Sequence, residues 1–346
     1  MVAMSGGVDS SVAAALLKKE NNDICGATLR LFEPDGKVGN EVQRAKNVCD
    51  KLNIEHFVFD KRDLFRNEVI DRFSKGYDNG FTPNPCIECN KYIKFGALLD
   101  EAVNMGMDYI ATGHYSKIIK DASTGKYAIV RPEDSKKDQT YVLWRLNQYQ
   151  LSHILMPLGE YTKDTVKQIA LEYGFESAKA KESQDICFVP DGDYASFLKN
   201  NCGTKFFEGD YVNINGEYLG KHLGHQHYTV GQRKGLGIAL GKPQFVISKN
   251  PDTNKVVLAD EEYLFKKKVF IEDVNLSFID RTDSPFKCTA KLRYSAKDMP
   301  CRIEMLSDNS AVIEFESPQR APSAGQSAVF YDHNILIGGG VIIKGE

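Results

Sequence analysis

The sequence has no long hydrophobic run and no leader-like start. Its apolar runs, such as residues 13–17, fall far short of the ~20 residues that cross a bilayer, so we expect no membrane-spanning helix. Met1 is followed almost at once by a glycine-rich turn instead of a basic and then an apolar segment, so we expect no signal peptide. We therefore expect a cytoplasmic protein with reduced cysteines.

An excess of charge is also absent. Lys and Arg number 44 against 47 Asp and Glu, a formal net charge of −3, so the molecule as a whole does not attract nucleic acid and any such partner must be held by local patches. The 346 residues are 42% hydrophobic and 26% charged, which excludes a disordered chain and a fibre. At roughly 100 to 200 residues per domain, the length predicts two or three domains.

Short apolar strands alternate with amphipathic helices in the first part of the chain. Four segments are expected to be strands: Val2–Met4, Ile24–Leu31, Ile54–Phe59 and Tyr109–Thr112. This alternation predicts an α/β domain with a doubly wound parallel sheet, whose ligands collect beyond the carboxyl ends of the strands. A further helix is expected over Lys163–Tyr173, capped by Thr162 and ended by Gly174.

The character of the sequence changes near residue 203, where glycine, aromatic and β-branched residues increase. Asn215-Gly216 between two short strand-like segments predicts a β-hairpin. From residue 268 to the end the pattern is nearly all strand. We therefore predict an α/β domain over residues 1–202 and two small β-rich domains, a central module over 203–262 and a C-terminal β-barrel over 263–346.

The segment Ser5–Ser11 follows the first strand and opens a helix. Adjacent Gly6 and Gly7 let the backbone turn its N–H groups inward, and the helix adds the positive end of its dipole, so the segment predicts an anion-binding nest. The alternative is an ordinary turn in which Asp9 or Ser10 caps the helix. The string lacks the Gly-Lys-Ser/Thr ending of the Walker A loop, so transfer of a γ-phosphate is not expected.

Three of the eight cysteines, Cys86, Cys89 and Cys187, have a chemical context. Cys89 stands in a Cys-x-x-Cys pair before a helix expected to run from Lys91, where a helix dipole stabilises a thiolate, and Cys187 follows polar residues. Half of a zinc site is the alternative for Cys86 and Cys89, but no second pair stands at zinc-ribbon spacing. The remaining cysteines are expected to be structural: Cys25, Cys49, Cys202, Cys288 and Cys301.

Eight separate strings indicate a family. They are Ser5–Ser11, Thr82–Phe95, Ala111–Tyr115, Lys137–Gln139, Asp185–Phe188, Tyr228–Gly237, Arg293–Tyr294 and Gly325–Ala328. The first resembles the pyrophosphate loop (PP-loop) of the N-type ATP pyrophosphatases, and together they stand in the order found in the MnmA family of bacterial tRNA-specific 2-thiouridylases. This resemblance covers essentially the whole chain. It implies 2-thiolation of the wobble uridine, position 34, in lysine, glutamate and glutamine tRNAs.

The resemblance implies a cofactor and a set of site residues. ATP would be bound by Ala3, Met4, Ser5, Gly6, Gly7, Val8, Asp9, Ser10, Leu29 and Gly113. Asp9 would help to hold Mg²⁺ on the pyrophosphate. The target base would lie against Asn84, Pro85 and Cys86. The tRNA would be contacted by His114, Lys137, Asp138, Gln139, Arg293, Tyr294 and Gln326.

The resemblance also implies a route for sulfur. Cys187 would carry a persulfide supplied by a sulfur-donor protein, and Cys89 would act as the nucleophile, leaving a transient Cys89–Cys187 disulfide. The expected partners are thus tRNA, ATP and the donor, and neither a membrane nor DNA.

One departure from the family leaves alternatives open. Many members have aspartate, proposed as a general base, where this chain has Cys86, and a thiol replaces a carboxylate only when ionised. Cys86, Cys89 and Cys187 are instead able to ligate an iron–sulfur cluster that delivers sulfide. Another PP-loop ATP pyrophosphatase would not need the cysteine pair, and a non-catalytic RNA-binding protein would not need Ser5–Ser11.

Overall fold

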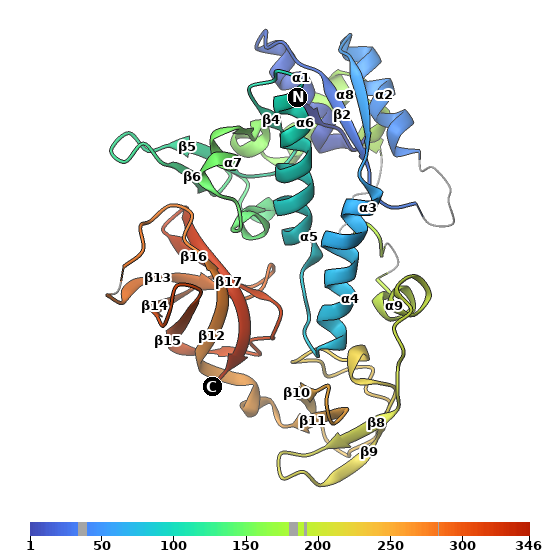
Figure 1. Ribbon diagram of the computed structural model, residues 1–346, viewed down its shortest axis with the longest axis vertical. Helices are drawn as coiled ribbons and strands as arrows, with labels where there is room; N and C mark the ends of the chain where they lie inside the picture. Colours follow the sequence, from blue (N-terminus) through green and yellow to red (C-terminus); the bar gives the residue numbers. More distant parts are fainter. Residues whose placement is uncertain (34–39, 180–185, 190–191, 283) are drawn as a thin grey trace.

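The computed structural model describes residues 1–33, 40–179, 186–189, 192–282 and 284–346. Its ribbon separates into a helix-rich first domain with the N-terminus, a small sheet module and a barrel (Figure 1). The 3-10 turn η9 (Glu261–Leu264) leads from the module into the barrel. Within the described part of the chain, no helix combines the length and the apolar character needed to span a bilayer.

The first domain is built on a parallel sheet of five strands in the order β3-β2-β1-β4-β7. Its strands are β1 (Val2–Ala3), β2 (Gly26–Arg30), β3 (His56–Asp60), β4 (Ile110–Ala111) and β7 (Ile154–Leu155). The first four are the predicted strands, and the doubly wound parallel sheet is confirmed. Because β1 has β2 on one side and β4 on the other, the direction of winding reverses beyond the carboxyl ends of β1 and β4, where such folds bind ligands.

Helices cover both faces of this sheet. On one face lie α1 (Val8–Lys19), α2 (Glu41–Leu52) and α8 (Lys163–Glu172), whose apolar side chains share a core with β1 and β4. On the other lies one continuous helix formed by α5 (Pro85–Glu88), the π-helical η3 (Cys89–Ala97) and α6 (Leu98–Asn104). Thr162 caps α8 and Gly174, at φ +64°, follows its end, as predicted.

Shorter helices complete the first domain and its edges. A second continuous helix consists of α3 (Arg62–Phe65), η2 (Arg66–Ile70) and α4 (Asp71–Asp78). The others are η4 (Ser135–Lys137), η5 (Thr140–Leu143), α7 (Gln148–Ser152), η6 (Pro157–Glu160), η7 (Glu176–Lys179) and α9 (Tyr194–Cys202). The short η8 (His225–His227) lies in the central module.

The central module is a four-stranded sheet in the order β10-β11-β8-β9. Its strands are β8 (Gly209–Val212), β9 (Tyr218–His222), β10 (Phe245–Asn250) and β11 (Lys255–Ala259). The antiparallel pair β8 and β9 is joined through Asn215-Gly216, with Gly216 at φ +83°, so the predicted hairpin is confirmed. The module has a small core of its own around Tyr211 and Val256.

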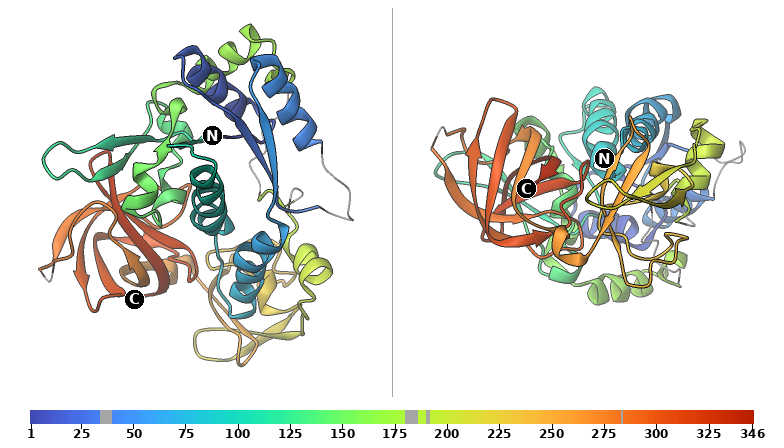
Figure 2. Two further views of the ribbon diagram at one scale, coloured as in Figure 1. Left: turned by 45° about the horizontal axis from the view of Figure 1, so that its top comes forward. Right: turned by 90° about the horizontal axis from the view of Figure 1, so that it is seen from below.

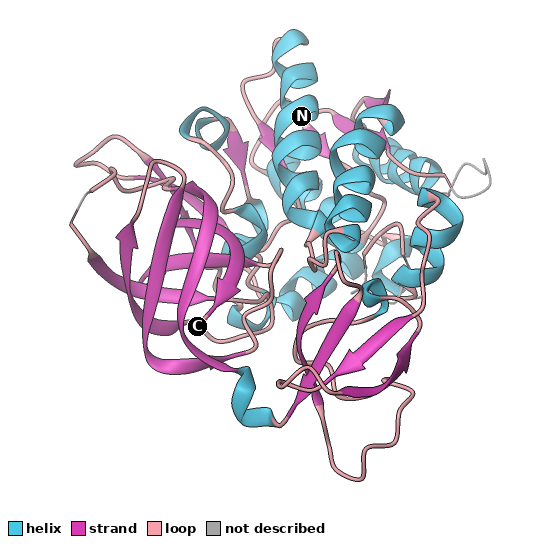
Figure 3. Ribbon diagram, turned by 60° about the horizontal axis from the view of Figure 1, so that its bottom comes forward, coloured by secondary structure: helices cyan, strands magenta, loops and turns pink. Residues whose placement is uncertain are grey.

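The C-terminal part closes into a six-stranded barrel, which confirms the predicted class of this region. Its strands are β12 (Phe265–Asn275), β13 (Phe286–Lys291), β14 (Met299–Met305), β15 (Ser310–Arg320), β16 (Ser327–Asp332) and β17 (Ile335–Gly345). They run in the order β12-β15-β14-β13-β16-β17, and pairing of β12 with β17 closes the circle. Figure 3 shows this barrel and the central module as separate groups of strands.

A hairpin of the first domain extends the sheet of the barrel. It consists of β5 (Lys117–Lys120) and β6 (Tyr127–Val130), and β6 pairs with the start of β17. Figures 1 and 2 both show the hairpin reaching over the barrel. The two bodies also share a core, in which Trp144 of the first domain packs with Val329 and Leu336 of the barrel.

Two further contacts fix the barrel against the segment that precedes α5. The Thr82 N–H donates to the Ala324 carbonyl at 2.8 Å, and Gln326 Nε2 donates to the Thr82 carbonyl at 2.6 Å. Between these two bonds, Gly325 has φ +87°, and a Cβ there would lie 2.7 Å from Phe81 Cβ. The barrel loop therefore needs glycine both for its backbone conformation and for its closeness to the first domain.

Gly325→Ala should therefore loosen the docking of the barrel. Backbone strain at positive φ costs about 1–2 kcal/mol, and the overlap with residues 81 and 82 adds roughly 1–3 kcal/mol. The chain has one tryptophan, Trp144, which is fully buried at this seam. Its emission during urea denaturation should shift to longer wavelength at a lower urea concentration in the variant than in the wild type.

Gly125→Ala is the matched control. Gly125 also has a positive φ, +71°, but a Cβ added there would have no atom of the described residues within 4 Å. The Gly125→Ala variant should lose only the stability that backbone strain costs, because the added methyl group overlaps no neighbour among the described residues. Equal losses of stability in the two variants would contradict the packing argument.

Candidate functional site

The loop between β1 and α1 is held close to two other segments. Gly6 has φ +70°, and a Cβ there would lie 2.7 Å from Arg44 Cβ at the start of α2. Gly113, two residues after the end of β4, passes so near the first turn of α1 that an added Cβ would lie 2.7 Å from the carbonyl carbon of Asp9. Glycine at these positions lets three segments meet at the carboxyl edge of the sheet.

The first turn of α1 offers free N–H groups. Gly7 is the N-cap, and within the described residues no side chain caps this helix. Ser10 and Ser11 direct their hydroxyls to the Gly7 carbonyl, at 3.1 and 2.8 Å. The alternative of an ordinary turn capped by Asp9 or Ser10 is therefore wrong, and the geometry is that of an anion-binding helix terminus.

Asp9 points into a cluster of donors. Its Oδ1 accepts from the Tyr115 hydroxyl at 2.9 Å and from Lys163 Nζ at 2.7 Å. Met4 is buried and Ala3 is half-buried at the end of β1, and Leu29 is half-buried near the end of β2. The residues expected to bind ATP thus surround the carboxyl edge between β2, β1 and β4.

The cysteine-bearing helix begins at Pro85, six residues earlier than expected. Asn84 is its N-cap and accepts from the Cys86 N–H at 3.1 Å, while Pro85 occupies the first helical position, where its missing N–H costs nothing. The expected start at Lys91 is therefore wrong. Cys86 lies exposed in the first turn, and Cys89 is buried one turn further along.

Cys187 is presented by an anchored turn. The Val189 N–H donates to the Ile186 carbonyl at 2.8 Å, and Cys187 is exposed between them. The next side chain, Phe188, is buried, with its ring centroid 5.4 Å from that of Phe73. The string to which Cys187 belongs begins at Asp185, which lies outside the described residues.

The three cysteines lie within electrostatic reach of one another. Burial raises the pKa of Cys89 to about 12, with the charges of Cys187 and Cys86 adding to the rise. The side chains of Cys86 and Cys187 reach solvent, but the protein around them still desolvates both thiols. This desolvation raises the pKa of Cys187 to about 11, with the charge of Cys86 adding to the rise, and it raises the pKa of Cys86. The ammonium of Lys94 opposes the rise at all three. The expected stabilisation of a Cys89 thiolate is therefore wrong in this state, because burial outweighs the helix dipole.

The loop after β4 joins the phosphate loop to the cysteines. Directly after Gly113, His114 is buried, with Nδ1 2.7 Å from Thr112 Oγ1 and its ring 5.7 Å from that of Phe95. Burial, reinforced by the charge of Lys94, holds the pKa of His114 well below its usual value, so the imidazole is neutral.

Tyr294, which follows β13, is a barrel residue expected to contact tRNA. Its ring is about half exposed, 44%, and contacts Tyr141 edge to face at 6.0 Å. Burial raises the pKa of Tyr294, and the charges of Asp138 and Cys86 raise it further. Tyr294 of the barrel and Cys86 of the first domain therefore lie within electrostatic range of each other.

Several residues expected to contact tRNA also bind protein. Arg293 Nη2 donates to the carbonyls of Val230, at 3.1 Å, and Ala321, at 2.7 Å, and so links the central module to the barrel. Gln139 Oε1 accepts from the Tyr115 N–H at 2.8 Å. Asp138 Oδ1 accepts from the Thr140 N–H and hydroxyl, and Lys137 is half-buried.

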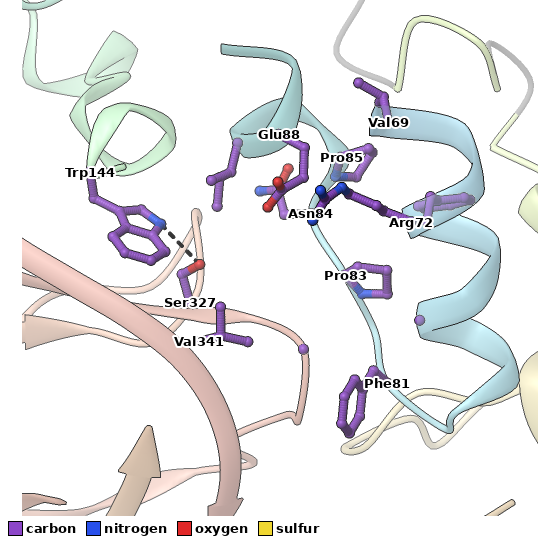
Figure 4. Close-up of a pocket in the computed structure, with 14 residues that line it drawn as sticks. Val69, Arg72, Phe81, Pro83, Asn84, Pro85, Glu88, Trp144, Ser327 and Val341 are labelled. Carbon is purple, nitrogen blue, oxygen red and sulfur yellow. Dashed lines mark hydrogen bonds between the residues drawn. The ribbon is translucent and has the colours of Figure 1, made fainter. Parts of the chain in front are cut away.

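A cavity of about 170 Å³ lies between α4, the segment before α5 and the barrel (Figure 4). Asn84 and Pro85 form part of its wall, opposite Trp144, whose Nε1 donates to Ser327 Oγ at 3.0 Å. Glu88 forms an ion pair with Arg145, but its Oε2 has no partner within the described residues. The first turn of α5, which carries Cys86, is therefore backed by space as well as by packed side chains.

Comparison with known proteins places these features in one family. The family model "tRNA methyl transferase HUP domain" matches residues 1–191, "tRNA methyl transferase PRC-barrel domain" matches 195–260 and "Aminomethyltransferase beta-barrel domain" matches 266–342. The chain is 45% identical to the tRNA-specific 2-thiouridylase MnmA of Carboxydothermus hydrogenoformans, over 99% of this chain and 97% of that protein. The chain belongs to the MnmA family. MnmA of Clostridioides difficile is 47% identical, over 99% and 98% of the two chains.

The sequence interpretation missed two lysines of the site. Lys94 acts electrostatically on the three cysteines, and Lys163 forms an ion pair with Asp9. Lys94 lies five residues after Cys89, a spacing that an ordinary α-helix would turn away but that the π-helical η3 brings nearer to the cysteine face. Its presence within Thr82–Phe95 was the available signal. No sequence signal pointed to Lys163, because it is 154 residues from Asp9 in the chain.

A shared metal site does not fit the cysteines as they are placed. Taking only the residues that the structure describes, no three His, Cys, Asp or Glu side chains are grouped closely enough to hold a metal ion. Cys86, Cys89 and Cys187 thus do not form a ready ligand set for an iron–sulfur cluster in this arrangement.

The raised pKa values predict the reactivity of the thiols. Since thiolates are the reactive species, alkylation of the exposed Cys86 and Cys187 by iodoacetamide should still rise about tenfold per pH unit at pH 8 to 9. Lys94→Met should slow both reactions, because it removes the cation that favours the thiolates. Peptide mass spectrometry of timed samples measures the two rates, with the urea-unfolded chain as reference. A plateau below pH 8 would contradict the burial argument.

Proposed function

We propose that this protein uses ATP to replace the C2 oxygen of the wobble uridine of tRNA by sulfur, giving 2-thiouridine at position 34 of lysine, glutamate and glutamine tRNAs. The observation that carries this proposal is the connection between a phosphate-binding helix terminus and three cysteines. Gly113 touches Asp9, and the next residue, His114, packs on Phe95 of the helix that carries Cys89. The names of the relatives agree with this chemistry.

ATP would bind at the carboxyl edge of the parallel sheet. Its pyrophosphate part would lie on Ser5–Ser10, where the uncapped N–H groups of α1 attract anions. The adenosine part would lie along Ala3, Met4, Leu29 and Gly113. Asp9 would hold Mg²⁺ once its present partners release it, and the metal would neutralise charge on the phosphates.

The target base would enter beside Cys86. Asn84, Pro85 and Cys86 form the rigid start of α5, and Tyr294 provides an aromatic ring at the same place. Such rings stack on unpaired bases. Contacts to the remaining tRNA are proposed for His114, Lys137, Asp138, Gln139, Arg293 and Gln326.

The chemistry would proceed in two stages. The uridine O2 attacks the α-phosphorus of ATP, the bond to the β-phosphate oxygen breaks, and pyrophosphate leaves with the electron pair. The resulting adenylate turns a poor leaving group into a good one. The terminal sulfur of a persulfide on Cys187 then attacks C2 and displaces AMP, and Cys89 attacks Cys187 Sγ, which releases 2-thiouridine and leaves the Cys89–Cys187 disulfide. A cellular thiol reductant resets the pair.

We propose that Cys86 does not act as the general base, the role proposed for the aspartate that many members have at this position. Burial raises its pKa, so its thiol is protonated at neutral pH. Since the three cysteines do not form a ligand set here, we propose the persulfide route, with the persulfide coming from a donor protein.

Thiolation should depend on both cysteines, whereas adenylation should not. Cys89→Ser and Cys187→Ser should each lower formation of 2-thiouridine in unmodified glutamate tRNA by at least ~10³-fold, the scale of losing an enzyme nucleophile. Pyrophosphate release that depends on tRNA should persist in both. Mercury-gel retardation measures the thiolated tRNA, and a coupled phosphate assay measures pyrophosphate.

Cys202→Ser is the matched control, because Cys202 is half-buried at the end of α9 and has no proposed role in sulfur transfer. It should thiolate tRNA like the wild type. Indistinguishable activity of the Cys89, Cys187 and wild-type proteins would refute the proposed route. Iron and labile sulfide in anaerobically purified protein, with activity lost on chelation, would favour the cluster instead.

A further inference from the structure

Lys163 is a buried lysine whose ammonium points at the phosphate loop. It is 7% exposed, and its Nζ lies 2.7 Å from Asp9 Oδ1. Its Nζ also lies 5.6 Å from the centre of the Tyr115 ring, whose hydroxyl donates to the same carboxylate oxygen. Burying an ammonium is costly unless it is paired, so this placement calls for a reason.

The fold fixes the direction of this side chain. Lys163 is the first residue of α8, whose N-cap is Thr162, and its backbone N–H donates to Asp134 Oδ2 at 3.0 Å. Further along α8, Val166 and Ala170 are fully buried in the core shared with α1. The first turn of α8 is thus anchored from both sides, and the Lys163 side chain leaves it toward the first turn of α1.

The Asp9 carboxylate supplies the negative charge that pairs with this ammonium. It stands in the first turn of a helix without a side-chain cap among the described residues, and a buried ammonium faces it. A bound polyphosphate would bring several negative oxygens to the same turn. Its metal ion would compete with Lys163 for Asp9, and its oxygens would compete with Asp9 for Lys163.

We propose that Lys163 binds the pyrophosphate part of ATP, and that its ion pair with Asp9 is the resting arrangement that the nucleotide displaces. This inference rests on the proposed use of ATP. As uridine O2 bonds to the α-phosphorus and the bond to the β-phosphate breaks, negative charge grows on the departing pyrophosphate. A fixed ammonium beside those oxygens stabilises that charge more than it stabilises bound ATP, so Lys163 serves departure as well as binding.

The test is direct measurement of binding by calorimetry on the whole chain. Lys163→Met should weaken binding of MgATP roughly 10- to 100-fold, the effect of losing a hydrogen bond between charged groups. Binding of AMP, which lacks the β- and γ-phosphates, should change by less than about threefold, which also shows that the variant is folded. Lys163→Arg, which keeps the charge, should bind MgATP more tightly than Lys163→Met.

A second pair of measurements tests the displacement itself without metal. Asp9→Asn should strengthen binding of metal-free inorganic pyrophosphate, because the carboxylate no longer competes for Lys163. The double variant Asp9→Asn, Lys163→Met should lose this gain. A merely structural ion pair would give no such dependence, since either single change would then weaken every ligand alike.

Lys46→Met is the matched control, because Lys46 forms an exposed ion pair with Asp50 on α2 at 2.8 Å. It should bind every ligand like the wild type. MgATP binding by Lys163→Met equal to that of Lys46→Met, or an equal loss for ATP and AMP, would overturn the inference and leave the proposed function standing. Failure of the wild type to bind MgATP would overturn both.

Discussion

The site depends on the docking of the barrel against the segment that leads into the cysteine-bearing helix. Backbone and side-chain bonds from Ala324 and Gln326 hold Thr82 in place, and Gly325 permits the approach between them. Two residues later Asn84 caps the helix that carries Cys86 and Cys89. The position of the cysteines relative to Tyr294 is therefore set by contacts between domains, and the buried Trp144 and the pairing of β6 with β17 hold those domains together.

Enclosure by these domains determines the chemistry of the thiols. Burial raises the pKa of all three cysteines, with Lys94 as an opposing charge, and keeps His114 neutral. Neutral thiols are poor nucleophiles, so raised pKa values should slow the reaction of these cysteines with alkylating reagents at neutral pH. Persulfides are more acidic than thiols, so loading sulfur on Cys187 would itself supply the anion that the second stage of the proposed reaction needs.

The sequence allowed prediction of the features that are determined by residues close together in the chain. The strands of the first sheet, the Thr162 cap and the Asn215-Gly216 turn all follow from local patterns. The start of the helix at Pro85 also has a local signal that the sequence interpretation missed: asparagine is a favoured N-cap, and proline is favoured at the first helical position. Closure of the barrel through β12 and β17, and the ion pair between Asp9 and Lys163, had no such signal, because they join residues far apart in the chain. Arg293 was expected to contact tRNA, and its link between two domains had no signal either, because its carbonyl partners come from distant segments.

Two residues, Asp134 and Tyr115, form hydrogen bonds both with residues 136–139, a segment expected to contact tRNA, and with residues of the ATP site. Asp134 accepts from the Lys136 N–H with one oxygen and from the Lys163 N–H with the other. Tyr115 is fixed at its backbone by Gln139 and donates its hydroxyl to Asp9. Hydrogen bonds through Asp134 and Gln139 therefore connect residues 136–139 to the two residues that donate to the Asp9 carboxylate, Lys163 and Tyr115.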